Sequence, residues 1–119
     1  MKKFLKFYLP PILWAGVIFT LSSFPTLETS EIYWQDFVLK KSAHMIEYAV
    51  FALLIYRALK YSGTKIRRAV VLSLLIAVIY AITDEFHQSF VPGREPKIRD
   101  VFFDTIGGAL GLSLFRKKV

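Results

Sequence analysis

Cysteine is absent from this chain, and acidic residues are scarce. The 119 residues include no Cys and only 9 Asp and Glu against 16 Lys and Arg, which gives a net charge of +7. Without cysteine, disulfide bonds and thiol chemistry are excluded. The sequence also lacks a Gly-x-Ser-x-Gly elbow, a phosphate-binding loop and a dinucleotide motif, so it does not indicate the enzyme classes that use them. No nucleic-acid fingerprint accompanies the positive charge, so we expect no nucleic-acid partner.

Hydrophobic residues are abundant and make up 55% of the chain. They form four segments, at residues 7–24, 41–59, 69–86 and 101–115. A soluble domain of this size would have little interior in which to bury them. A helix that crosses a membrane needs about 20 residues, which the first segment approaches without any charge and the others approach when their polar ends are counted. We therefore predict an all-α, polytopic membrane protein, with a single domain over residues 1–119 and four transmembrane helices.

The charged residues alternate between the two ends of these segments. One set is basic and contains no acid: Lys2, Lys3, Lys6, Arg57, Lys60, Lys65, Arg67, Arg68, Arg116, Lys117 and Lys118. The acidic residues all lie in the other connections or in the helix ends beside them: Glu28, Glu31, Asp36, Glu47, Asp84, Glu85, Glu95, Asp100 and Asp104. Short loops rich in Lys and Arg stay in the cytoplasm. The pattern predicts cytoplasmic termini, acidic connections outside, and contact between the basic groups and anionic membrane lipids.

Proline and glycine mark the expected helix boundaries. We expect the first helix to begin near Pro10-Pro11 and to end before Pro25. The sequence before Pro25 offers no good cleavage site for a signal peptidase, so this helix should be retained. Aromatic residues within residues 25–40 predict a short helix at the membrane interface. Gly63 should end the second helix.

Polar residues gather at the expected outer ends of the last three segments. They are Lys41, His44, Glu47 and Tyr48 in the second, Asp84, Glu85, His87 and Gln88 in the third, and Asp100 and Asp104 in the fourth. Spacings of three and four residues place most of each set on one helical face. A charged side chain at the centre of a bilayer costs about 2.5–3.5 kcal/mol, so these groups should face one another and not lipid. We expect them to form one pocket that faces outside.

Two interpretations of this set remain open. In a structural ion-pair network, Lys41 would pair with Glu47 or Asp84, and an arginine would pair with Asp100. In a ligand site, Lys41 would bind an anion such as phosphate or carboxylate, because a cation near a helix amino terminus is disfavoured by the dipole. Two further cations, Arg94 and Arg99, would join it there.

A divalent metal is a third and weaker interpretation. His44 with Glu47, and Asp84 with His87, have the spacing of helical metal ligands. The stronger His-Glu-x-x-His form is missing. The sequence therefore requires no cofactor, and the metal dependence stays unknown.

Glycines in the last segment predict close helix packing. Gly107 and Gly111 have the Gly-x-x-x-Gly spacing, and Gly108 lies between them. We expect contacts within the chain that bring Asp104 close to the second and third helices. Dimerisation through the same face is the alternative, and the oligomeric state is otherwise not indicated.

Four motifs in this order resemble the VanZ-like family of small bacterial membrane proteins. They are Ile18-Phe19-Thr20-Leu21-Ser22-Ser23 with Pro25, Lys41-x-x-His44-x-x-x-Tyr48, Asp84-Glu85-x-x-Gln88-x-Phe90-x-Pro92-Gly93-Arg94, and Asp100-x-x-x-Asp104-x-x-Gly107-x-x-x-Gly111. The family often has Asn where this chain has Asp104. The resemblance implies a four-helix protein of the bacterial cell envelope. The founding member of the family is associated with resistance to glycopeptide antibiotics, chiefly teicoplanin.

Three functions follow as hypotheses. In the first, the protein binds, and in one version modifies, an anionic envelope lipid or cell-wall precursor at the outer leaflet of the cytoplasmic membrane. Its expected ligand-binding residues are Lys41, Tyr48, Gln88, Arg94, Arg99 and Asp100, and its expected acid–base residues are His44, Asp84, Glu85 and Asp104. His44 is the best candidate for proton transfer, because the ordinary pKa of histidine lies near neutrality.

The second hypothesis is a non-enzymatic scaffold, or a protein that blocks the access of an antibiotic, whose polar residues are structural. The third is a proton or ion path. No ionisable residue lies deep in the inner half of any segment, so a continuous relay lacks members.

Overall fold

The computed structural model describes residues 2–23, 33–91 and 98–119 of the chain. Over these residues it contains helices and no strands: α1 (Lys2–Ser22), α2 (Tyr33–Tyr61), α3 (Ile66–Gln88), α4 (Ile98–Phe115) and the short 3-10 turn η1 (Arg116–Lys118). The all-α class predicted from the sequence is confirmed, and the described residues of each hydrophobic segment fall almost entirely within one helix.

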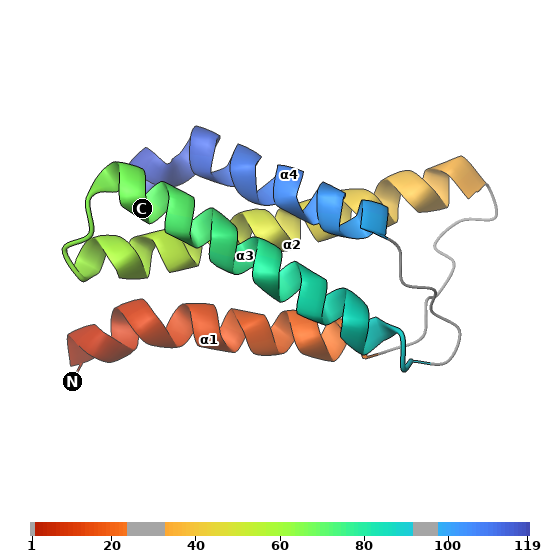
Figure 1. Cartoon of the computed structure of the whole chain (residues 1–119), viewed down its shortest axis with the longest axis horizontal. Helices are drawn as coiled ribbons and strands as arrows, with labels where there is room; N and C mark the ends of the chain where they lie inside the picture. The colour runs from red at the N-terminus through yellow and green to blue at the C-terminus, as the bar shows by residue number, and fades with distance from the viewer. Residues whose placement is uncertain (1, 24–32, 92–97) are drawn as a thin grey trace.

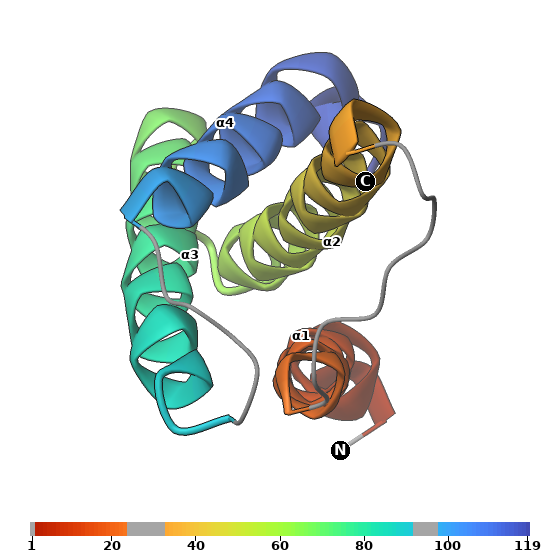
Figure 2. The same cartoon turned by 90° about the vertical axis from the view of Figure 1, so that its right-hand side faces the viewer.

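The four helices run alternately in opposite directions along the long axis. Both termini and the α2–α3 turn lie at one end of the molecule (Figure 1). Viewed along the axis, α2, α3 and α4 form one group, and α1 lies beside it on the side away from α4 (Figure 2). The molecule measures 46 × 27 × 20 Å. Its length is similar to the thickness of a bilayer with its head groups, about 40–45 Å.

Much of the apolar surface of the helices faces outward. Among the described residues, α1 over Lys2–Leu21 and α3 over Ile66–Gln88 are long and apolar enough to cross a membrane. Large side chains such as Ile12 and Ile79 are 66% and 60% exposed. Helices α2 and α4 do not meet the same criteria of length, hydropathy and charge. Both contain charged residues. By length and composition, α1 and α3 match membrane spans.

The start of the first helix was predicted wrongly. Helix α1 begins at Lys2, and both Pro10 and Pro11 lie inside it. A proline inside a helix removes one backbone hydrogen bond, but the helix can continue through it where other contacts support the preceding turns. Proline is then a poor guide to the helix boundary. Here the Phe7 ring stacks on Tyr61 with centroids 4.3 Å apart, and the Arg57 guanidinium lies 4.6 Å from the Phe7 centroid. These contacts attach the beginning of α1 to the end of α2.

A separate interfacial helix before the second segment was also predicted wrongly from residue 33 onward. Tyr33 begins a single helix of 29 residues that continues to Tyr61. No proline or glycine occurs between these two residues to interrupt it. The earlier part of the expected interfacial segment, residues 25–32, lies outside the described residues.

The predicted stop at Gly63 is confirmed. Gly63 has a φ of +90°, in the left-handed region that glycine adopts without strain. Its N–H donates to the Lys60 carbonyl at 3.0 Å, and the Thr64 N–H donates to the Leu59 carbonyl at 3.1 Å. This pair of hydrogen bonds is a Schellman motif, which satisfies the last carbonyls of α2 and turns the chain into α3.

Candidate functional site

Glycine allows the backbones of α2 and α4 to touch. A Cβ atom on Gly107 would lie 2.3 Å from the Met45 carbonyl oxygen, and one on Gly111 would lie 2.8 Å from the Ala49 Cβ. Any side chain at either position would force the helices apart. The expectation of close packing within the chain is confirmed, and it holds Asp104 against α2.

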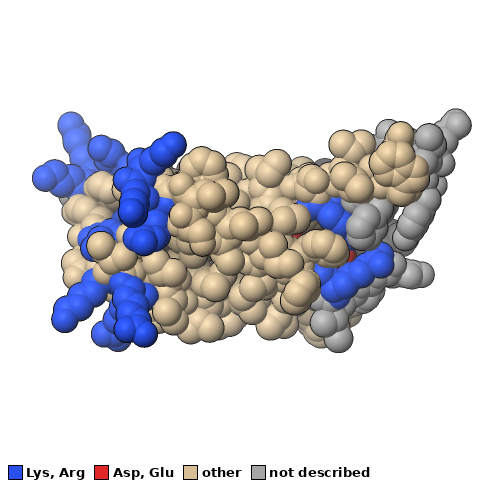
Figure 3. Space-filling model, turned by 90° about the horizontal axis from the view of Figure 1, so that it is seen from above, with Lys and Arg blue, Asp and Glu red and all other residues tan. Residues whose placement is uncertain are grey.

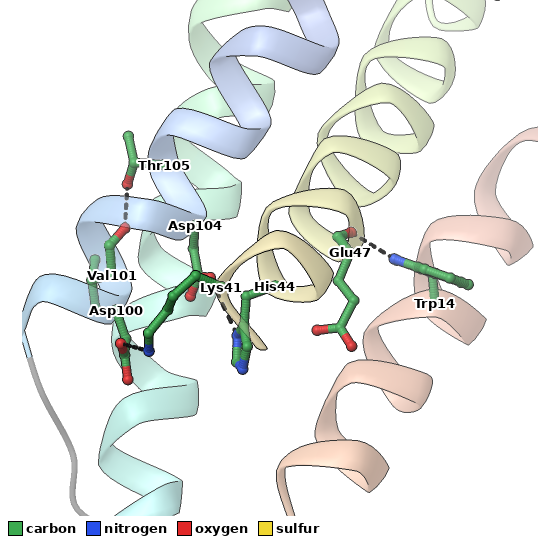
Figure 4. Close-up of polar contacts among 8 residues, drawn as sticks. All are labelled: Trp14, Lys41, His44, Glu47, Asp100, Val101, Asp104 and Thr105. Carbon is green, nitrogen blue, oxygen red and sulfur yellow. Dashed lines mark hydrogen bonds and ion pairs between the residues drawn. The ribbon is translucent and has the colours of Figure 1, made fainter. Parts of the chain in front are cut away.

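Two polar pairs connect α2 to α4 just beyond this contact (Figure 4). The Lys41 ammonium contacts the Asp100 carboxylate, and both side chains are partly exposed, at 15% and 12%. One turn further in, His44 Nδ1 lies 3.4 Å from Asp104 Oδ1, and Asp104 is only 1% exposed. The two helices run in the same direction, so successive turns of one meet successive turns of the other (Figure 1).

This register produces an ion pair that the structural interpretation did not expect. Lys41 was expected to pair with Glu47 or Asp84, and Asp100 with an arginine. In the structure, Lys41 contacts Asp100. The reason is the parallel contact of α2 and α4, which brings the ends where both helices begin to the same side of the molecule.

The third helix contributes buried polar residues to the same region. Asp84, Glu85 and Gln88 of α3 are 4%, 8% and 2% exposed. Asp104 is close enough to Asp100 and Asp84 to interact with them electrostatically, and fully buried Tyr48 interacts with Asp84 and Asp104. We call this set the polar cluster; it consists of Lys41, His44, Tyr48, Asp84, Asp100 and Asp104.

Several atoms of this region are buried without a hydrogen bond to the described part of the chain. They include His44 Nδ1, the Tyr48 hydroxyl, Gln88 Nε2 and both carboxylate oxygens of Asp104. The contact between Asp104 and His44 is a charge contact, longer than an ordinary hydrogen bond. Leaving a buried polar group without a hydrogen bond costs about 1–3 kcal/mol. The binding of a water molecule or a polar ligand that supplies the missing partners would therefore be favourable.

A family profile covers all the residues of the polar cluster. The profile of the VanZ/LLP1 family matches residues 7–118, which include all of α2, α3 and α4 and most of α1. The chain belongs to the VanZ/LLP1 family. Comparisons with curated proteins and with solved structures give no match. Membership of the VanZ/LLP1 family confirms the resemblance drawn from the four motifs, and it is consistent with a protein of the cell envelope.

One predicted member of the site lies elsewhere in this VanZ/LLP1 protein. His87 was expected to share a face with Asp84 and Gln88, but its ring stacks on Phe19 of α1 at 4.2 Å. Its Nε2 also lies 3.0 Å from Ser23 Oγ, so a serine of the first family motif contacts the histidine of α3. His87 and Gln88 follow Asp84 by three and four residues, so they project on either side of it around the helix. The side of His87 is the one that α1 covers.

The metal interpretation loses support from this position of His87. In residues 2–23, 33–91 and 98–119, no three His, Asp or Glu side chains are arranged to bind one metal ion. His44 and Asp104 form a contact between one histidine and one carboxylate. Together with Asp84, they remain the acid–base candidates that the structure brings close together.

The expected anion-binding residues are only partly assembled. Lys41 lies about two turns inside α2, which begins at Tyr33, so the helix dipole does not disfavour its charge and that argument was wrong. Arg99 is exposed in the first turn of α4. Arg94 lies outside the described residues. The Lys41 ammonium is partly exposed and contacts the Asp100 carboxylate.

The sequence did not predict the residues that attach α1. The Trp14 indole N–H donates to the Glu47 carbonyl at 2.8 Å, and the Tyr80 hydroxyl donates to the Ala15 carbonyl at 2.5 Å. The partners are 33 and 65 residues apart in sequence, so no local pattern identifies them. Glu47, expected in the site, is half-buried and lies on the α1 side of α2, as Figure 4 shows.

Proposed function

We propose that this VanZ/LLP1 protein crosses the bacterial cytoplasmic membrane four times, with both termini inside, and that its polar cluster faces outside. The support is the distribution of charge. Lys and Arg side chains gather at the end that holds the termini and the α2–α3 turn, and a broad uncharged zone separates them from the other end (Figure 3). Short loops rich in Lys and Arg stay in the cytoplasm, and an apolar middle suits the interior of the bilayer.

Labelling of single cysteines tests this topology, and the native chain has no cysteine to interfere. Glu31→Cys and Glu95→Cys should react with an impermeant thiol reagent on intact cells. Lys65→Cys and Lys118→Cys should react only after the cells are permeabilised. Reaction at Lys65→Cys without reaction at Glu95→Cys in intact cells would reverse the proposed orientation.

We further propose that the polar cluster binds the anionic head group of an envelope lipid or cell-wall precursor. The observation that carries this proposal is the position of Lys41, a partly exposed cation at the edge of buried polar groups that lack hydrogen bonds. An ammonium is a strong partner for a phosphate oxygen, and 15% of the Lys41 side chain stays exposed beside Asp100. A link to teicoplanin-type resistance belongs to the same proposal.

Native mass spectrometry with added lipid tests the binding. Phosphatidylglycerol, which is anionic, should be retained more strongly than neutral phosphatidylcholine. Lys41→Gln should lower the retention of phosphatidylglycerol by about tenfold, equal to about 1.4 kcal/mol. The matched control is Lys65→Gln, an exposed lysine at the other end of the bundle, which should change nothing. Equal losses in both variants, or no loss in Lys41→Gln, would contradict a site at Lys41.

A modifying activity is the second candidate, and the contact between His44 and Asp104 favours it. A carboxylate beside one ring nitrogen orients the imidazole and leaves Nε2 to exchange a proton with a bound molecule. The same spectrometer would then record turnover of the retained molecule by the wild type but not by His44→Gln. Retention without any change in mass favours a binding protein.

A further inference from the structure

We infer that an anionic phospholipid binds where α1 meets α2 at the basic end of the molecule, and that it fastens α1 to the other helices. The basic end is the end that holds the termini and the α2–α3 turn (Figure 1). The inference rests on the proposed membrane crossings but not on the polar cluster, which lies toward the other end. It starts from the slight burial of α1. In its apolar span 6% of the residues are buried, against 33% in the span of α3.

Aromatic rings attach α1 to α2 at the basic end. Phe7 of α1 stacks on Tyr61 of α2, and the Tyr8 ring meets the same tyrosine edge-on, with centroids 5.9 Å apart. Tyrosine favours the interface between hydrocarbon and water, where its ring is apolar and its hydroxyl can reach polar groups. The two tyrosines therefore place this junction at the depth of the lipid head groups.

Two cations from different helices converge on the Phe7 ring. The Lys6 ammonium of α1 lies 5.6 Å from the ring centroid, and the Arg57 guanidinium of α2 lies 4.6 Å from it. The face of an aromatic ring attracts each cation. The two positive charges nevertheless repel one another across the junction, because like charges at this separation interact unfavourably.

The described part of the chain does not supply an acidic side chain to this end. Helix α1 contains no Asp or Glu, and none follows Glu47 in α2 or precedes Asp84 in α3. Glu47 lies about 15 Å along α2 from Arg57. An anion that relieves the repulsion must therefore come from the surroundings. At the depth of the head groups, that anion is the phosphate of an anionic lipid.

A phosphate between Lys6 and Arg57 would contact one donor from each helix. Ammonium and guanidinium groups both form charge-assisted hydrogen bonds with phosphate oxygens. The same contacts would replace the repulsion between α1 and α2 by attraction to a shared anion. The other end of α1 has contacts of its own, including Ser23 with His87 of α3. Removal of the lipid should therefore release the beginning of α1 and not its end.

Distances between two spin labels test the inference, and the chain has no native cysteine to interfere. Leu5→Cys at the start of α1 and Leu114→Cys at the end of α4 provide label sites, since these leucines are 44% and 65% exposed. We expect a narrower distance distribution in nanodiscs that contain phosphatidylglycerol than in phosphatidylcholine alone. Inorganic phosphate added to phosphatidylcholine nanodiscs should not reproduce the narrowing. Both leaflets of a nanodisc have the same lipids, so the result is independent of orientation.

Substitutions of single cations assign the effect to the junction. Lys6→Gln and Arg57→Gln should each lose the narrowing that phosphatidylglycerol causes. The matched controls are Lys65→Gln and Arg67→Gln, which remove the same charges from exposed positions at the same end and should keep it. Each variant is compared with itself in the two lipids, so a general loss of stability does not imitate the result.

The outcomes separate a bound lipid from its alternatives. Equal distributions in the two lipids would show that no anionic lipid holds α1. Equal losses in Arg57→Gln and Arg67→Gln would show only a general attraction to the basic end, and narrowing by inorganic phosphate would identify a soluble anion; either result overturns the inference. The anion site proposed at Lys41 is tested by lipid retention, so each proposal can fail while the other stands.

Discussion

Gly107→Ala is expected to destabilise the protein by about 1–3 kcal/mol, because it overpacks a contact between two backbones. The added methyl group would lie 2.3 Å from the Met45 carbonyl oxygen and 2.6 Å from the Met45 Cα. Backbone atoms of a helix cannot rotate away as a side chain does, so α4 would have to move away from α2. That movement would also separate His44 from Asp104. Thermal melting in detergent, followed by circular dichroism, measures the effect.

Gly16→Ala is the matched control for this prediction. Gly16 also lies inside a helix, but a Cβ atom there would meet nothing within 4 Å. Alanine is the better helix former by up to about 1 kcal/mol, so this variant should melt at the same temperature or higher. Removal of a large exposed side chain, Leu114→Ala, should likewise have little effect, since Leu114 is 65% exposed. Equal melting temperatures for Gly107→Ala and Gly16→Ala would show that the close α2–α4 contact is wrong.

The sequence predicted the helices better than their ends. Hydrophobic segments and alternating charge depend on composition over many residues, so one exception does not change them. A helix end depends on a few local contacts. Pro10 suggested a start that the stacking of Phe7 on Tyr61 overrides, whereas Gly63 gave a correct stop because its positive φ is a local requirement. The four membrane crossings stay a prediction, since α1 and α3 are the helices with sufficient apolar length among the described residues.

The sequence predicted the members of the polar cluster better than their partners. Helical spacing placed Lys41, His44 and Tyr48 on one face, and it did the same for Asp100 and Asp104. It does not contain the register between two helices, which decides that Lys41 meets Asp100. The close contact of Gly107 and Gly111 with the α2 backbone sets that register. How closely the two helices approach is visible only in the structure. The roles of these residues in binding or catalysis stay predictions.

The largest effect of a charge change is expected at the Lys41–Asp100 pair. Lys41→Gln leaves the Asp100 carboxylate without this cation, and Asp100→Asn leaves the ammonium without this carboxylate. Loss of one partner of a buried pair costs about 3–5 kcal/mol. Both side chains keep 12–15% exposure, so we expect each single variant to lie at the lower end of that range. The double variant should recover much of the loss, because neither charge remains.

The double variant separates a structural pair from a binding site. If Lys41 serves only to hold α2 against α4, then Lys41→Gln with Asp100→Asn should recover the melting temperature and the cellular phenotype together. If Lys41 binds an anion, the double variant should recover the melting temperature but should still retain about tenfold less phosphatidylglycerol than the wild type. Melting curves and native mass spectra of the same four samples give both results. Recovery of lipid retention in step with stability would assign the pair to the scaffold and leave the anion site without its principal cation.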